Sequence, residues 1–150
     1  MRVEREEWTP ELYVELLSLF EDHIEETAST LGPLDVHLEL YFLMEEQGTL
    51  HTIVARDDEG KVIGYMTCTI SVHPHHQTVL LGTQDAFFVH KDYRKGSVGT
   101  KIIKKAEKVL IERGAQHLTM FYSESKDLKK YYERLGYKPI EHTVYKKVGD

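Results

Sequence analysis

The sequence predicts one mixed α/β domain of the α+β kind, in which helices flank a central, mixed but mostly antiparallel sheet. Two helical patterns follow a short N-terminal strand, and three strand patterns then succeed one another through turns. In the last third of the chain, strand and helix patterns alternate. The expected order of elements is therefore β-α-α-β-β-β-α-β-α-β, in a single domain over residues 1–150.

Composition places the chain among ordinary soluble domains, with 41% hydrophobic and 29% charged residues. The formal net charge of -6 argues against nucleic acid as a partner. No apolar run reaches the roughly 20 residues that span a bilayer, and the charged N-terminus has no signal-peptide core, so we expect no membrane association. The one cysteine, Cys68, cannot form an internal disulfide, which fits a cytoplasmic protein.

The first half of the expected order is predicted from residues that cap helices and from residues that end them. Residues 1–6 form a candidate edge strand, and Thr9 with Pro10 marks the start of the first helix. Asp35 is the expected cap of a second helix that runs to about residue 47 and ends at Gly48.

Three strands are expected next, at His51–Arg56, Lys61–Val72 and Thr78–Val89. A glycine-containing hairpin turn at residues 57–60 joins the first two. The turn between the second and third carries His73, His75 and His76, whose spacing matches no recognised zinc site. We interpret it as a solvated turn and predict no metal.

The last third begins with a helix from Val98 to about Arg113. A strand at His117–Tyr122, a helix at Lys126–Arg134 and one or two final strands within Lys138–Lys147 complete the expected order.

Residues 85–105 carry the clearest functional signal. Ala86–Val89 is an apolar strand, residues 90–99 are a polar loop with two glycines, and an amphipathic helix starts at Val98. A strand, a glycine loop and a helix start present unpaired backbone N–H groups to an anion, and Arg94 and Lys95 add positive charge. The pattern therefore predicts a phosphate-binding turn, although an ordinary strand-turn-helix would look similar.

The spacing of this turn fits neither the P-loop nor the dinucleotide-binding pattern. It resembles motif A of the GNAT N-acetyltransferase superfamily, [RQ]-x-x-G-x-[GA], because Arg94 and Gly99 match. Ser97 stands in place of the first family glycine, and Gly96 lies one position early. The segments Asp58–Tyr65 and Lys130–Tyr137 resemble a hairpin and the terminal motif of the same family, so the resemblance covers nearly the whole chain.

The resemblance implies acetyl-CoA as cosubstrate. The strand before the turn would hold the pantetheine arm through the backbone of Phe87, Phe88 and Val89. Arg94 would attract the pyrophosphate by its charge. The backbone amides expected to bind the pyrophosphate are those of Lys95, Gly96, Ser97, Val98, Gly99 and Thr100. Ser125, where the family often has asparagine, would contact the cofactor or cap the following helix.

The resemblance also implies two catalytic roles. Tyr132 would protonate the departing thiolate, for which a phenol with a pKa near 10 is suited; the neighbouring Tyr131 is the alternative if the helix register differs. Asp85, or an ordered water, would act as the general base, and burial in an apolar strand would raise its pKa. Backbone amides near Val89 would polarise the thioester carbonyl.

These expectations together describe a cytoplasmic N-acetyltransferase that transfers acetyl from acetyl-CoA to a primary amine by direct attack in a ternary complex. The acceptor, a small molecule or a protein amine, and the assembly, monomer or homodimer, stay open. The departure at Ser97 and the open identity of the base leave one alternative, an inactive GNAT-like module that binds acyl-CoA or a partner protein without turnover. A structural or interaction domain that has lost the cofactor is the second alternative.

Overall fold

The computed structural model describes residues 1–27 and 29–149. The chain forms two compact units, Met1–Met120 and Phe121–Asp150. The elements of the first unit are, in chain order, β1 (Arg2–Glu6), α1 (Pro10–Thr27), α2 (Leu38–Glu46), β2 (Leu50–Arg56), β3 (Val62–His73), β4 (His76–Val89), the 3-10 turn η1 (Lys91–Tyr93), α3 (Val98–Glu112) and β5 (His117–Thr119).

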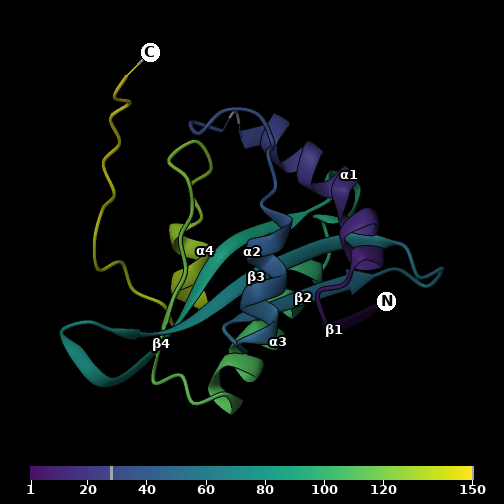
Figure 1. Cartoon of the computed structure of the whole chain (residues 1–150). Helices are drawn as coiled ribbons and strands as arrows, with labels where there is room; N and C mark the ends of the chain where they lie inside the picture. Colours follow the sequence, from purple (N-terminus) through teal and green to yellow (C-terminus); the bar gives the residue numbers. More distant parts are fainter. Residues whose placement is uncertain (28, 150) are drawn as a thin grey trace. The chain divides into compact units, whose positions relative to one another are not determined.

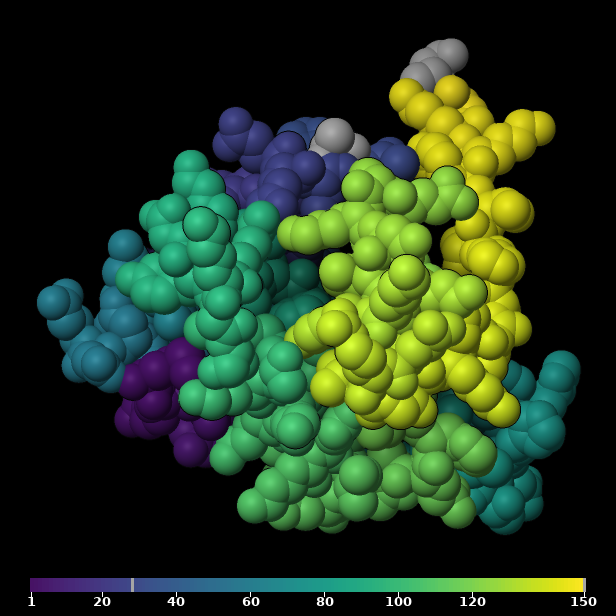
Figure 2. Space-filling view, turned by 180° about the vertical axis from the view of Figure 1, so that it is seen from behind, coloured from purple at the N-terminus to yellow at the C-terminus, as the bar shows by residue number. Residues whose placement is uncertain are grey.

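One sheet of five strands organises the first unit, in the order β1-β2-β3-β4-β5. The first four strands pair antiparallel, and β5 pairs parallel to β4. Figure 1 shows α2 in front of this sheet, and Figure 2, seen from behind, brings the green residues of α3 to the near surface. The predicted fold class, a mostly antiparallel mixed sheet flanked by helices, is confirmed.

The two N-terminal helices begin at side-chain caps. The Thr9 hydroxyl accepts a hydrogen bond from the Leu12 amide at 3.1 Å, as expected of the cap of α1. The cap of α2 differs from the expectation, because His37 Nδ1 accepts from the Leu40 amide at 3.0 Å. Asp35 therefore does not cap this helix: an imidazole nitrogen two residues later satisfies the first-turn donor instead.

An aromatic and aliphatic core lies between α1, α2 and one face of the sheet. Trp8 is 3% exposed and stacks on Tyr41 of α2, with the two ring centroids 4.5 Å apart. The fully or nearly buried residues of this cluster are Trp8, Leu12, Leu16, Leu19, Phe20, Leu50, Val54, Val62, Tyr65 and Phe88. This packing fixes α2 over the central strands.

The other face of the sheet packs against α3, whose buried stripe repeats with helical period. Two glycines permit the close approach. A Cβ atom on Gly64 would lie 3.0 Å from Ile102 Cδ1 and 3.2 Å from the backbone oxygen of Phe88. A Cβ atom on Gly82 would lie 3.0 Å from Leu110 Cδ1. Both positions must stay small for α3 to lie on the sheet.

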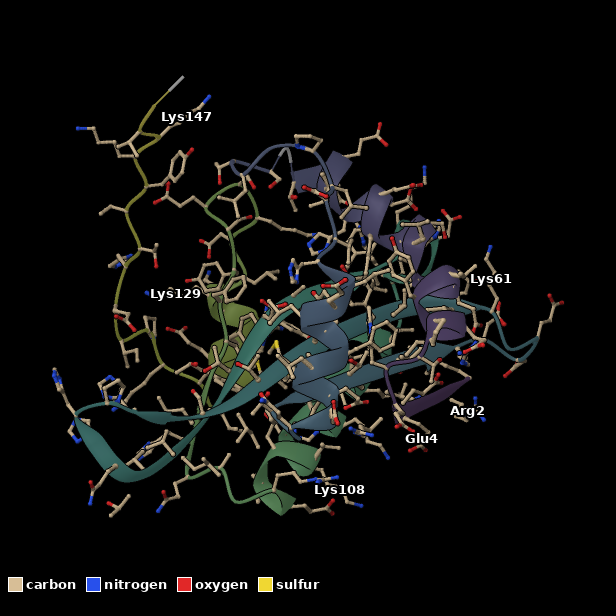
Figure 3. All side chains as sticks on the ribbon, viewed as in Figure 1. Arg2, Glu4, Lys61, Lys108, Lys129 and Lys147 are labelled. Atoms are coloured by element: carbon tan, nitrogen blue, oxygen red, sulfur yellow. The ribbon has the colours of Figure 1, made fainter. Side chains whose placement is uncertain are left out.

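Charged side chains line the edge strand β1. Arg2 and Glu4 project outward from it (Figure 3), and Lys105 Nζ of α3 lies 2.6 Å from Glu4 Oε2. Charges of this kind discourage pairing of an exposed edge with another strand.

The second unit contains α4 (Lys129–Arg134), which starts three residues later than the sequence predicted. The final strands expected within Lys138–Lys147 are absent, since residues 137–149 form neither helix nor strand. The physical reason is the lack of a ladder partner: these residues are nearly all exposed, and Pro139 removes one donor.

In the first unit, the strand expected at His117–Tyr122 is shorter than predicted and ends at Thr119. No helix in the described part of the chain is long and apolar enough to cross a membrane.

Candidate functional site

The strand β4 changes its surroundings halfway along. It pairs with β5 only from Leu81 to Thr83, where the Thr119 hydroxyl donates to the Thr83 hydroxyl at 3.0 Å. From Gln84 to Val89 it continues beside β3, and its other edge has no strand partner among the described residues. The two strands thus part, and the second half of β4 presents an unpaired backbone edge.

The register of the β3–β4 ladder identifies the groups on this open edge. The His90 amide donates to the Ile63 oxygen at 2.9 Å. Hydrogen-bonded and non-hydrogen-bonded pairs alternate in an antiparallel ladder, so Phe88 directs its backbone toward β3 whereas Phe87 and Val89 direct theirs away. The Val89 oxygen is taken by Arg94 Nε at 2.8 Å. The remaining outward groups are the N–H and C=O of Phe87 and the N–H of Val89.

This result refines the expected cofactor contacts on β4. Phe87 and Val89 have the backbone orientation that a ligand along the strand requires, and Phe88 does not. The Phe88 side chain is 7% exposed and belongs to the core. Its predicted contact with a pantetheine arm therefore stays a prediction, with the backbone geometry favouring its two neighbours.

After β4, the 3-10 turn η1 and residues 94–97 lead into α3. Lys95, Gly96 and Ser97 are exposed, whereas the Val98 side chain is buried and fixes the helix start against the sheet. Ser97 is the N-cap residue but makes no side-chain cap hydrogen bond. An added Cβ on Gly96 would meet nothing within 4 Å, so the space before the turn is open.

These features fit an anion at the helix start. The first-turn N–H groups of a helix have no intrahelical acceptor, and the macrodipole adds partial positive charge there. Gly99 and Thr100 lie in this first turn and are half-buried. The residues predicted to hold the pyrophosphate are thus brought together at one end of α3.

Arg94 has a less open position than the sequence suggested. Its guanidinium pairs with the Glu26 carboxylate of α1 through both terminal nitrogens, in addition to the bond to the Val89 oxygen. Its contact with a pyrophosphate stays a prediction.

Asp85 occupies a β-bulge. Thr67 pairs with Ala86, and the next residue of β3, Cys68, pairs with Gln84, so Asp85 is one extra residue on β4. The bulge turns its side chain to the face beneath α1 and α2, where the Thr67 hydroxyl donates to Asp85 Oδ2 at 3.0 Å. The side chain is exposed, so the burial that the sequence suggested for this acid is wrong. Bulges commonly re-aim a side chain in this way beside functional sites.

Two tyrosines of the same face lie close to this carboxylate. Burial, followed by the charge of Asp85 and a hydrogen bond to it, raises the pKa of Tyr41 to about 12. Burial also raises the pKa of Tyr65, with smaller contributions from Tyr41 and Asp85. Both phenols are therefore protonated donors at neutral pH. Burial and then Asp85 raise the pKa of the Cys68 thiol to about 12, which agrees with a core role for this cysteine and not a nucleophilic one.

Sequence reasoning missed Tyr41, Thr67 and the contact between His23 and Tyr65. His23 Nδ1 lies 2.7 Å from the Tyr65 hydroxyl, and the imidazole stacks on Phe88 with centroids 4.9 Å apart. Polar residues alternate with apolar ones along β3, and this alternation was a signal that could have found Thr67. Tyr41 gave no such signal, because it falls on the same helical stripe as the apolar residues of α2.

The second unit carries the other predicted catalytic residue. Tyr132 is 4% exposed and stacks on Tyr122 at 6.0 Å, with Tyr131 and Tyr137 in edge contacts at 5.7 and 5.6 Å. Of the adjacent pair, Tyr132 is the buried one. Its role as proton donor stays a prediction.

Ser125 is exposed, and its hydroxyl lies 2.9 Å from that of Ser123. It does not cap α4, since that helix begins at Lys129, whose amide donates to Asp127 Oδ1 at 2.9 Å. The alternative of a capping role is therefore wrong, and the cofactor contact stays a prediction.

The histidine turn joins β3 to β4. The His73 ring lies 5.7 Å from that of His75 and 5.2 Å from that of His76. Within residues 1–27 and 29–149, no group of three histidine, cysteine, aspartate or glutamate side chains is arranged to hold a metal ion.

Residues 48–139 match the family model described as an acetyltransferase (GNAT) domain. The match covers more than half of the chain, and the chain therefore belongs to the GNAT acetyltransferase family, as its motifs indicated. Members of this family transfer acyl groups and use acetyl-CoA as cosubstrate. No curated protein matches the sequence with significant similarity.

Solved structures of acetyltransferases share the fold. A Trypanosoma brucei acetyltransferase is similar with a TM-score of 0.74 at 18% identity, over 98% of this chain and 100% of that chain. An aminoglycoside acetyltransferase from an uncultured soil metagenomic sample, in complex with sisomicin, has a TM-score of 0.74 at 18% identity, over 99% and 95%. A ribosomal-protein-alanine N-acetyltransferase from Brucella melitensis biovar Abortus 2308 has a TM-score of 0.74 at 15% identity, over 99% and 100%.

Proposed function

We propose that this protein is an acetyl-CoA-dependent N-acetyltransferase that acetylates a primary amine by direct attack in a ternary complex. The observation that supports it most is the order of two features: the second half of β4 has no strand partner on one edge among the described residues, and α3 follows with no side-chain cap from Ser97. Together they offer backbone donors and an acceptor to a long ligand that carries a pyrophosphate. Acetyl-CoA supplies an activated thioester when bound.

The chain's own groups would hold the cosubstrate in two places. The outward backbone groups of Phe87 and Val89 would bind the pantetheine arm, and the amides from Lys95 to Thr100 would bind the pyrophosphate. The Val89 N–H would also polarise the thioester carbonyl. The protein thereby supplies orientation and a preorganised donor, which are the main contributions it can make to a reaction whose leaving group is already activated.

Asp85 would remove the proton of the attacking amine, directly or through an ordered water. Its carboxylate accepts the Thr67 hydroxyl and lies close to the Tyr41 hydroxyl, and both donors aim it toward the face beneath α1 and α2. The amine nitrogen then bonds to the carbonyl carbon, the carbon–sulfur bond breaks, and the thiolate takes up a proton. Tyr132 would donate that proton, since a phenol is a donor at neutral pH.

The acceptor is proposed only as a chemical class, a primary amine. The fold neighbours include an aminoglycoside acetyltransferase and a ribosomal-protein-alanine N-acetyltransferase, so their names cover a small molecule and a protein amine. An exposed carboxylate at Asp85 suits a cationic amine in either case.

One experiment separates this proposal from a module without turnover. The thermal stability of the purified protein is followed with acetyl-CoA, and free thiol is then assayed with a panel of amines. Stabilisation and amine-dependent thiol release support the enzyme, stabilisation alone supports an acyl-CoA-binding module, and neither result supports a domain that has lost the cosubstrate. Gly99→Val is the matched control. A side chain in the first turn of α3 would obstruct the pyrophosphate, so acetyl-CoA should not stabilise this variant.

A further inference from the structure

Arg94 lies shortly after the end of β4 and contacts three residues of the first unit, one on α1 and two on β4. Its Nη1 donates to Glu26 Oε1 at 2.7 Å, and its Nη2 donates to Glu26 Oε2. Its Nε donates to the Val89 oxygen at 2.8 Å. Its Cζ lies 5.1 Å from the centroid of the Phe88 ring. The planar fork of an arginine makes all of these contacts in one orientation, which lysine cannot reproduce.

The peptide group between Val89 and His90 is held from both sides. Its oxygen accepts from Arg94, and its N–H donates to the Ile63 oxygen of β3 at 2.9 Å. The chain then passes through η1 and reaches the proposed pyrophosphate turn at Lys95, directly after Arg94. The bond from Arg94 to the Val89 oxygen therefore ties the start of that turn to the end of β4.

The partner carboxylate comes from a distant part of the sequence. Glu26 lies in the last turn of α1, 68 residues before Arg94. The same end of α1 carries His23, which stacks on the Phe88 ring that the guanidinium also contacts. An ion pair and a ring stack thus join α1 to the end of β4.

We propose that Arg94 is a positioning residue that holds the pyrophosphate turn through Glu26 and the Val89 oxygen, and that it is not itself the phosphate clamp. This inference rests on the proposed function, since it assigns how that site is held. A residue that binds the phosphate directly would turn its guanidinium N–H groups toward the ligand, whereas the terminal N–H groups of Arg94 are bound to the Glu26 carboxylate.

The two roles predict opposite results for Glu26→Gln. If Arg94 positions the turn, loss of the carboxylate loosens it and weakens acetyl-CoA binding by about tenfold. If Arg94 is a phosphate ligand, Glu26 competes with the phosphate and its neutralisation strengthens binding. Arg94→Lys separates them again, because lysine can serve phosphate as a point charge but cannot bind both Glu26 and Val89.

The test is calorimetric titration of acetyl-CoA into the wild type, the two variants and their double variant, with Glu25→Gln as control. Glu25 is an exposed neighbour on α1, so its variant makes the same change of charge. We expect weaker binding in Glu26→Gln and Arg94→Lys, a double variant no weaker than the worse single, and wild-type affinity in Glu25→Gln. Stronger binding in Glu26→Gln, or wild-type affinity in Arg94→Lys, overturns the inference.

A second measurement needs no ligand. Hydrogen exchange of the His90 amide in the free protein should be at least about tenfold faster in Glu26→Gln and Arg94→Lys than in Glu25→Gln. Unchanged exchange overturns the positioning role. A wild type that does not bind acetyl-CoA, but whose His90 exchange responds to the variants, would remove the proposed function and leave the positioning role standing.

Discussion

The two faces of the five-stranded sheet bury different kinds of side chain. The face toward α3 is mainly apolar, with Met66 and Ile102 at 0% exposure and His51 buried among them at 1%. The face beneath α1 and α2 combines aromatic core residues with hydroxyls and a carboxylate, at Tyr65, Thr67 and Asp85. One sheet thus supplies stability on one side and positioned polar groups on the other. The difference is possible because side chains alternate across a strand, so a single strand such as β3 serves both purposes.

The largest expected effect is on the α3 face. Ile102→Ala should lower the free energy of unfolding by about 2–5 kcal/mol, because it removes a fully buried side chain that packs on Gly64. Denaturant unfolding measures it. The matched control is Ile111→Ala on the same helix, where the side chain is 58% exposed and little change is expected. Equal losses in both variants would contradict the division between faces.

The burial of His51 on that face also predicts a pH dependence of stability. Burial, and then the charges of Arg5 and Arg113, lowers the pKa of His51 to about 4. Between that value and the unfolded value of about 6.5, the unfolded chain binds the proton and the folded chain does not. The free energy of unfolding should therefore fall as the pH drops through this window, by up to about 3 kcal/mol at full protonation.

His51→Gln should reduce this slope, measured by denaturant unfolding at several pH values. His75→Gln, in the exposed hairpin turn, is the control. If the His51→Gln slope equals that of the wild type, His51 is not held neutral.

On the polar face, Asp85→Asn should change activity and not stability. We expect kcat to fall by about 100-fold, because the base is lost, while the free energy of unfolding stays within about 0.5 kcal/mol for an exposed side chain. Steady-state kinetics and denaturant unfolding give both numbers, with Asp22→Asn on α1 as control. If the kcat of Asp85→Asn equals that of the wild type, water or another group is the base and Asp85 is not.

Tyr132→Phe tests the proposed proton donor in the second unit. A donor acts in the transition state as the carbon–sulfur bond breaks, so kcat should fall by about 100-fold with little change in acetyl-CoA affinity. Tyr131→Phe is the control. If Tyr132 only packs against Tyr122 and Tyr137, the loss of its hydroxyl would change stability by about 1 kcal/mol and leave kcat unaltered. A large loss in Tyr131→Phe alone would move the role to that residue.

Much of the first unit could be predicted from the sequence because its signals are local. Alternation and turn glycines indicated β2, β3 and β4, and helical periodicity indicated α3 from Val98. The bulge could not be predicted, because one extra residue at Asp85 leaves no mark in an alternating pattern. The pairing of Arg94 with Glu26 depends on tertiary structure across 68 residues. In the C-terminal segment, the local pattern suggested strands, but no local pattern supplies the partner that a strand requires.

The most direct test of the central claim concerns the open edge of β4. Hydrogen exchange of backbone amides is measured by NMR for Phe87, Phe88 and Val89, with and without saturating acetyl-CoA. The Phe88 amide, which faces β3, should be protected in both states. The amides of Phe87 and Val89 should exchange faster in the free protein and slow by at least about tenfold when acetyl-CoA binds. Binding that leaves the exchange of Phe87 and Val89 unchanged would contradict the placement of the cosubstrate along this strand.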